Sequence, residues 1–260
     1  MRACSVVFVA VMACGASTMP AAGLDPIKES CTLSVGDKAE AFRLGTDYGD
    51  CDNHRHCGSS MSDVPVGRFS GISIPDLVRQ GAQLTATLEA EAGRFTCYGT
   101  VKESELVGVS IFTPSAEFVT RMEQMGFKGF DAQKLLAYAL LDVRSDWARS
   151  LKEMGIRTLT TDNLIALHIF HVDKDYVRSI TSLGYPQPDA EQLVAVSCQG
   201  VNAAEVREIR ALGYQPTLDQ LVQIRIFKIT PDFIRRMQAR GFSNLTLEKL
   251  VQIRIFKLVD

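Results

Sequence analysis

The sequence predicts an α+β protein in which a small antiparallel β-domain is followed by an α-solenoid of five helix-pair repeats of about 29 residues. Two observations predict this class: a stretch with period-two alternation, and a turn that recurs at a fixed spacing. An apolar leader before them predicts a signal peptide. We therefore expect a signal peptide over residues 1–22, a β-domain over 30–112 and a helical repeat domain over 113–260.

The first residues have the three-part form of a secretory signal peptide. Arg2 is the positive residue, an apolar run over 3–13 follows, and small residues come after it. That run is too short to span a bilayer, which needs about 20 apolar residues. "VMAC" resembles a bacterial lipobox, so two outcomes stay open: lipidation of Cys14, or plain cleavage near Ala16 or Ala22. Both outcomes predict a periplasmic or extracytoplasmic protein. Only lipidation would add a contact with the membrane, through the lipid anchor.

Composition and motifs favour a binding protein over an enzyme. The formal net charge is -2 over 260 residues, which does not favour a nucleic-acid partner. The chain contains no nucleophile elbow, phosphate loop, HExxH motif or paired CxxC. We therefore expect no catalytic activity and no cofactor, and a protein as the partner.

Four segments of the predicted β-domain alternate in the way of strands with one buried face. The segments are "AEAFRLGTDYG", "AQLTATLEAEAG", "RFTCYGTV" and "ELVGVSIF". Ala92 and Gly93 predict a hairpin turn, and Ser73 with Asp76 predicts the start of a short helix. The expected fold is a small antiparallel sheet or a partly closed barrel.

The second half repeats a glycine-containing turn, with spacings of 29, 29, 29 and 28 residues. A fixed period in this range is typical of a solenoid. The turns contain Gly126, Gly155, Gly184, Gly213 and Gly241.

Each repeat contains two helical patterns. The first resembles residues 229–242 and ends at glycine, which adopts a left-handed cap at little cost. The second resembles residues 217–228 and is apolar nearly all round, so we expect it to be buried on more than one side. The first helix, which is more amphipathic, should face outwards. The predicted N-caps of the second helices are Asp131, Thr160, Asp189, Thr217 and Thr246.

The cysteines predict two disulfide bonds. The chain has seven cysteines, of which five remain after the leader is removed. Four of these allow three pairings, and Cys51–Cys57 is the most local, which leaves Cys31–Cys97. Cys198 stands where other repeats have isoleucine, so we expect a small buried side chain.

The segment "GDCDNHRHCGSS" is predicted to be a loop between strands. Its composition leaves three interpretations open: a disulfide-stapled loop, a metal or copper-type site, and free thiols. The metal site would use Cys51, His54, His56 and Cys57.

An arginine column is predicted on the first helices of successive repeats. It contains Arg149, Arg178, Arg207 and Arg235. Such a column could bind an acidic partner or an anionic lipid surface. Alternatively, Asp146, Asp175 and Asp232, each three residues before one of these arginines, neutralise three of the four locally.

The stretches "AGRFTCYGTV", "GVSIFTPSAEFVTRMEQMGF" and "LTTDNLIALHIFHVDKDYVRSITSLGY" resemble uncharacterised bacterial envelope proteins. Those proteins carry a small β-domain and helical repeats, and similar segments lie beside or fused to antirepressor-type membrane zinc metallopeptidases. The resemblance covers roughly residues 84–260, and this chain lacks the peptidase part. It implies an extracytoplasmic sensing or protein-binding role.

Two functions follow as hypotheses. The first is a non-enzymatic protein-binding or sensing module that uses the surface of the helical repeats. The second is a metal- or thiol-responsive sensor that uses the loop from Cys51 to Cys57.

Overall fold

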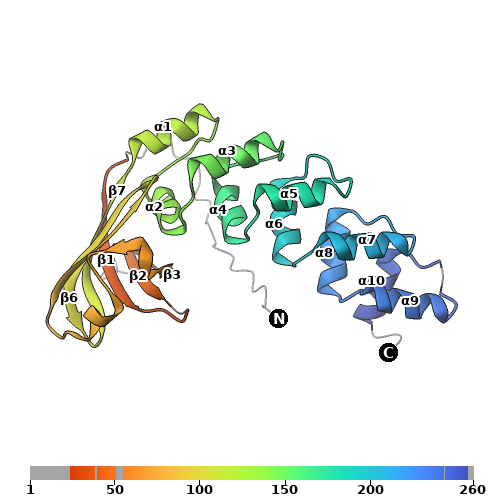
Figure 1. Ribbon diagram of the computed structural model, residues 1–260, viewed down its shortest axis with the longest axis horizontal. Coiled ribbons are helices and arrows are strands. Elements are labelled where there is room, and N and C mark those ends of the chain that lie inside the picture. The colour runs from red at the N-terminus through yellow and green to blue at the C-terminus, as the bar shows by residue number, and fades with distance from the viewer. Residues whose placement is uncertain (1–23, 39, 51–54, 243, 257–260) are drawn as a thin grey trace. The chain divides into compact units, whose positions relative to one another are not determined.

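The computed structural model describes residues 24–38, 40–50, 55–242 and 244–256. Strands occupy the first part of the chain and helices the second, which makes the protein α+β (Figure 1). The described residues form two compact units, one over 24–148 and one over 149–256. We call them the sheet unit and the helical unit. No helix in the described part of the chain is long and apolar enough to cross a membrane.

The sheet unit is built on a curled antiparallel sheet of seven strands. Their order is β3-β2-β1-β7-β6-β5-β4, so two runs of hairpins meet where β1 pairs with β7. A 3₁₀ helix over Ile74–Val78 connects β4 to β5. The strands are β1 (Ile27–Val35), β2 (Ala41–Asp50), β3 (Arg55–Pro65), β4 (Phe69–Ser70), β5 (Gln83–Ala90), β6 (Gly93–Lys102) and β7 (Glu105–Pro114).

The predicted alternation places its apolar residues inside the curl of the sheet. Side chains with at most 1% exposure come from every second position of β2, β5 and β6. They include Phe42, Leu44, Ala86, Leu88, Phe95 and Cys97. The predicted capping interaction is also present, because Asp76 accepts a hydrogen bond of 2.9 Å from the backbone N–H of Ser73.

A disulfide bond joins Cys31 of β1 to Cys97 of β6, across the intervening β7. Strands two places apart in a flat sheet lie about 9.6 Å from each other. The Cα atoms of Cys31 and Cys97 are only 6.1 Å apart, so the sheet bends sharply here. Gly108 pairs with both Cys31 and Gly99 at the bend. A Cβ atom on Gly108 would lie 2.0 Å from the carbonyl oxygen of Tyr98, so this bend requires glycine.

The turn between β5 and β6 holds the first helices against the sheet. Glu91 in this turn accepts hydrogen bonds from the backbone N–H (3.1 Å) and hydroxyl (2.7 Å) of Ser145. It also forms ion pairs with Arg144 at 3.2 Å and Arg121 at 3.8 Å. One carboxylate therefore ties together α1 (Ala116–Gln124), the start of α3 (Ser145–Glu153) and the sheet.

The second helix of the sheet unit, α2 (Ala132–Leu141), packs on β3, β5, β6 and β7. Arg68 fixes its C-terminus, donating a hydrogen bond of 2.9 Å to the carbonyl of Ala139. The same guanidinium lies 3.3 Å from the Asp142 carboxylate. The last carbonyls of a helix have no hydrogen-bond donor within the helix, and Arg68 supplies such a donor from the sheet side.

The helical unit contains seven further helices of eight or nine residues, together with the last part of α3. The division between the two units falls within α3. The seven helices are α4 (Thr161–Ile169), α5 (Lys174–Thr181), α6 (Ala190–Cys198), α7 (Ala203–Ala211), α8 (Leu218–Ile226), α9 (Pro231–Ala239) and α10 (Leu247–Ile255).

The predicted starts of the second helices and the predicted ends of the first helices are both confirmed. All five predicted caps, from Asp131 to Thr246, are N-caps whose side chain accepts a hydrogen bond from a first-turn backbone N–H. The five turn glycines, from Gly126 to Gly241, all have φ between 70° and 92°. This is the left-handed conformation that ends a helix. The helices α2, α4 and α8 end instead at left-handed residues other than glycine, namely Asp142, His171 and Lys228.

Removing the Cys31–Cys97 bond should destabilise the protein. The bond closes a loop of 66 residues, so the chain-entropy estimate is a loss of about 4 kcal/mol. We expect the double variant Cys31→Ala/Cys97→Ala to unfold at lower urea concentration than the wild type under non-reducing conditions. Equal unfolding midpoints would show that the bond does not constrain the unfolded chain.

Candidate binding surface

The even-numbered helices of the helical unit form a row. Helix α4 contacts α6, α6 contacts α8, and α8 contacts α10. The odd-numbered helices supply buried side chains to the same core, including Val177, Ile180, Val206 and Ile209, all with 0% exposure. An even-numbered helix inside this row is therefore covered by its two neighbours and by the odd-numbered helices. The described part of the chain leaves one side uncovered.

The uncovered side is apolar. Ile169, Ile226 and Ile255, at equivalent positions of α4, α8 and α10, are 48%, 52% and 48% exposed. Residues four positions earlier lie on the same face of a helix. We define the apolar strip by its six half-buried or exposed residues, which are Ile165, Ile169, Val194, Val222, Ile226 and Ile255.

This exposure adds a feature that the sequence analysis did not predict. The second helix of each repeat is apolar nearly all round, which predicted burial on more than one side. It is buried on its core face, where Leu164, Leu193, Leu221 and Leu250 are at most 1% exposed, but Ile226 faces solvent. The strip was therefore missed, although the all-round apolar pattern was the signal that could have revealed it.

An acidic row runs beside the apolar strip. It consists of the second residue of each even-numbered helix, namely Asp162, Glu191, Asp219 and Glu248, and all four are exposed. These residues precede the strip residues by three and seven positions, which places them on the same helix face. Carboxylates are stabilised near a helix N-terminus, so their charge also helps to stabilise the helices.

Hydrogen bonds between neighbouring helix pairs hold the acidic row in place. Gln220 donates to Glu248 at 2.6 Å, and Gln192 donates to Asp219 at 3.3 Å. The pKa of Glu248 is lowered by hydrogen bonds from its own backbone N–H, from Thr246 and from Gln220. Glu248 therefore carries its charge at neutral pH.

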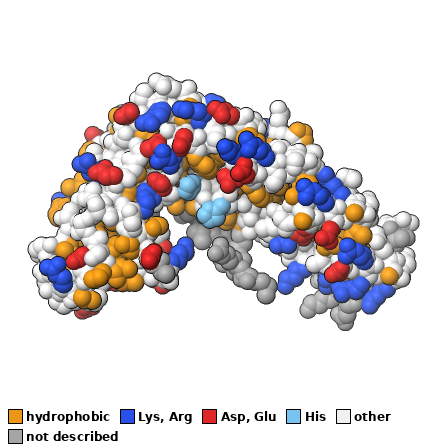
Figure 2. Space-filling view, in the orientation of Figure 1, with side chains coloured by type: hydrophobic (Ala, Val, Ile, Leu, Met, Phe, Trp, Pro, Cys, Tyr) orange, Lys and Arg blue, Asp and Glu red, His pale blue; other side chains and the backbone are white. Residues whose placement is uncertain are grey.

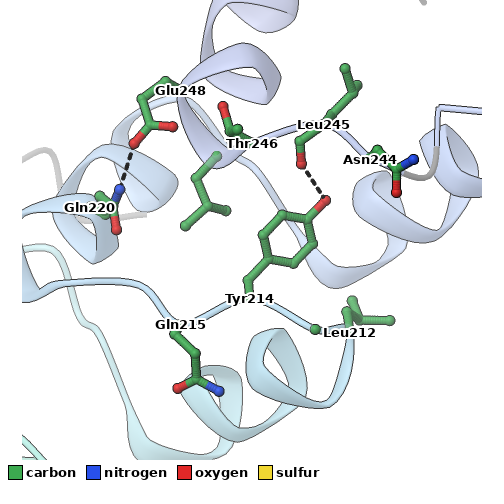
Figure 3. Close-up of a pocket in the computed structure, with 10 residues that line it drawn as sticks. Leu212, Tyr214, Gln215, Gln220, Asn244, Leu245, Thr246 and Glu248 are labelled. Atoms are coloured by element: carbon green, nitrogen blue, oxygen red, sulfur yellow. Dashed lines mark hydrogen bonds between the residues drawn. The ribbon is translucent and has the colours of Figure 1, made fainter.

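A shallow pocket of about 510 Å³ lies next to Glu248, between the turn before α8 and the start of α10. Figure 3 shows Tyr214 pointing from that turn to the backbone of Leu245, where its hydroxyl donates a bond of 3.0 Å. Tyr185 makes the equivalent bond to the carbonyl of Pro216. Three successive helix pairs, α5–α6, α7–α8 and α9–α10, are thus joined in the same way at their two junctions.

The C-terminal ends of the even-numbered helices are joined by a second series of bonds. Ser197 donates to the carbonyl of Phe170 at 2.7 Å, and Arg225 donates to that of Gln199 at 2.9 Å. Arg254 makes a longer bond of 3.4 Å to Lys228. Each acceptor is a carbonyl at a helix end, which has no partner within its own helix.

The predicted arginine column is partly neutralised. Arg178 lies 3.1 Å from Asp175, and Arg235 lies 2.7 Å from Asp232. Arg149 and Arg207 are exposed. On the face drawn in Figure 2, cationic and anionic side chains are interspersed along the middle helices.

The predicted residues of the cysteine- and histidine-containing segment cannot be placed as a site. Cys51 and His54 lie outside the described residues, as does the predicted lipidation site Cys14. His56 and Cys57 belong to β3, but their side chains lie outside those described. The loop before β3 is shorter than predicted, because β3 already begins at Arg55. The disulfide and metal interpretations of this segment stay predictions.

The described side chains include no group of three or more histidine, cysteine, aspartate or glutamate residues that could hold a metal ion. Cys198, which was expected to be a small buried side chain, is half-buried and disulfide-bonded.

Comparisons of the chain with protein-family models, with curated proteins and with solved structures found no significant match.

We expect Tyr214→Phe to destabilise the protein by about 1 kcal/mol, because it removes the hydroxyl that bonds to Leu245. Tyr185→Phe should have a similar effect through Pro216. Urea unfolding would measure both, with the exposed Tyr98→Phe in the sheet unit as the matched control. If all three variants unfold at the same midpoint, the tyrosine bonds do not stabilise the protein.

High pH should destabilise the protein through Tyr176. Burial raises the pKa of this phenol from 10.0 to about 12. A hydrogen bond with Ser197 lowers the pKa, but its effect is smaller than that of burial. Because the folded pKa is the higher one, the stabilising contribution is complete below pH 10 and is lost as the pH rises to about 12.

The absorbance of phenolate, titrated in folded wild type and in Tyr176→Phe, tests this prediction. The difference between the two curves should have its midpoint near pH 12 when the protein is folded, and near the ordinary value in urea. A midpoint near pH 10 in the folded protein would contradict the burial of this hydroxyl.

Proposed function

We propose that this protein is a non-enzymatic, extracytoplasmic binding or sensing module that holds a protein partner on its helical repeats. The observation that carries the proposal is the apolar strip. Solvent-exposed isoleucines recur at one helix position, in Ile169, Ile226 and Ile255. Isolated exposed apolar residues are ordinary, whereas a contiguous apolar area is typical of an interaction site.

The proposed architecture of the binding part is an α-solenoid of five helix pairs. The equivalent bonds at Tyr185 and Tyr214, and those at Ser197, Arg225 and Arg254, support it. Such an array stacks short helix pairs and presents an extended surface to a partner. A partner that lies on the strip would cover isoleucine side chains, which favours binding.

The proposed location is the periplasm or another extracytoplasmic compartment, in the lipidated case with an anchor at Cys14. The Cys31–Cys97 disulfide is compatible with it, because disulfides persist in oxidising compartments. The signal-peptide pattern of residues 1–22 and the resemblance to envelope proteins support the same location.

A photo-reactive amino acid at position 226 or 207 would test which surface holds the partner in cells. We expect a discrete crosslinked adduct from position 226, in the apolar strip, and none from position 207, in the arginine column. The additional substitution Ile169→Glu should remove the adduct, because it places a charge in the strip. An adduct from 207 alone would transfer the proposed role to the arginine column.

A further inference from the structure

The apolar strip and the acidic row together describe what a partner must look like. They lie on the same helix face from α4 to α10, and α6 contributes only Val194 to the strip, because Cys198 at its isoleucine position is half-buried and disulfide-bonded. Seven residues separate Asp162 from Ile169, as they do Asp219 from Ile226 and Glu248 from Ile255. At 1.5 Å per residue, the acidic row and the exposed isoleucines are about 10 Å apart along each helix. This is close to the diameter of one α-helix with its side chains.

The spacing across the row also fits a helix. Packed helices lie about 8–10 Å apart, so four even-numbered helices span about 30 Å, the length of a helix of about 20 residues. Seven residues of a partner helix rise about 10.5 Å, so a heptad would place one apolar side chain at each even-numbered helix. In an extended peptide, successive side chains point to opposite faces. Its apolar side chains would therefore match the spacing of the even-numbered helices less regularly.

The charges set the orientation of such a helix. The acidic row would attract lysine or arginine along one border of the partner. At the opposite ends of the even-numbered helices lie Arg225, Lys228 and Arg254, which disfavour a basic border there. Arg225 is partly compensated by Glu205 at 3.1 Å, so the acidic row is the stronger determinant.

We propose that the occupant of the apolar strip is an amphipathic α-helix of a partner protein, about 20 residues long, with basic residues along the border that faces Asp162, Glu191, Asp219 and Glu248. The inference rests on the proposed function and deepens it. It specifies the chemistry of the partner, which the proposed function leaves open.

The test uses the full chain and three synthetic fluorescent peptides of about 20 residues, the length that matches the row. One has leucines at heptad spacing and lysines along one border. The second has glutamates in place of the lysines, and the third has the composition of the first in scrambled order. Fluorescence anisotropy at low salt measures their binding, since exposed charges are screened by salt.

We expect the lysine peptide to bind about tenfold more tightly than the glutamate peptide, and the scrambled peptide to bind weakly. Asp219→Lys/Glu248→Lys should reverse the preference between the two charged peptides. Ile226→Ser/Ile255→Ser should weaken the binding of the lysine peptide by about tenfold, because the double variant removes apolar contact from the strip. The control Arg207→Ser, on an odd-numbered helix, should change neither result.

Circular dichroism and urea unfolding establish that each variant is folded, and Ile169→Ser replaces the double variant if that one is not. An unchanged preference in the charge-reversed variant would overturn the inference, as would equal binding of the scrambled peptide. A dimer of the chain that Ile226→Ser/Ile255→Ser dissociates would also overturn it, because the occupant would then be a second copy. If crosslinks form at position 226 but no peptide binds selectively, the inference fails while the proposed function stands.

Discussion

The helical unit depends on hydrogen bonds from the side chains of one helix pair to the last carbonyls of the pair before it. Helices of eight or nine residues are too short to be stable alone in water. Each also ends with carbonyls that have no partner within the helix. Ser197, Arg225 and Arg254 supply these partners from the next even-numbered helix, so each helix end is completed only when its neighbour is in place.

The same packing explains why an apolar surface stays exposed. The odd-numbered helices and the neighbours within the row leave one side of each even-numbered helix uncovered, and Ile226 on that side is 52% exposed. The exposed half of each isoleucine makes no contact within the described helices, so its apolar character suits a partner. The sheet unit is stabilised differently, because the Cys31–Cys97 bond holds together a sheet that bends sharply at Gly108.

Features with a local cause were predictable from the sequence, and features that depend on distant contacts were not. A cap such as Thr217 and a left-handed glycine such as Gly213 are determined by their own turn. The start of β3 was missed because the preceding residues have the composition of a turn, whereas pairing of Arg55 with Asp50 decides where the strand begins. The bond from Arg225 to Gln199 was missed because its acceptor lies 26 residues away.

The most direct measurement is hydroxyl-radical footprinting of isoleucine side chains in the full chain, without and with the crosslinked partner. The comparison is matched in residue type, because Ile169, Ile226 and Ile255 are about half exposed while Ile180, Ile209 and Ile234 have 0% exposure. We expect the first three to be oxidised in the free protein and protected in the complex, and the second three to be protected in both. Equal oxidation of the two sets in the free protein, or unchanged oxidation of the first set in the complex, would contradict a binding role for the apolar strip.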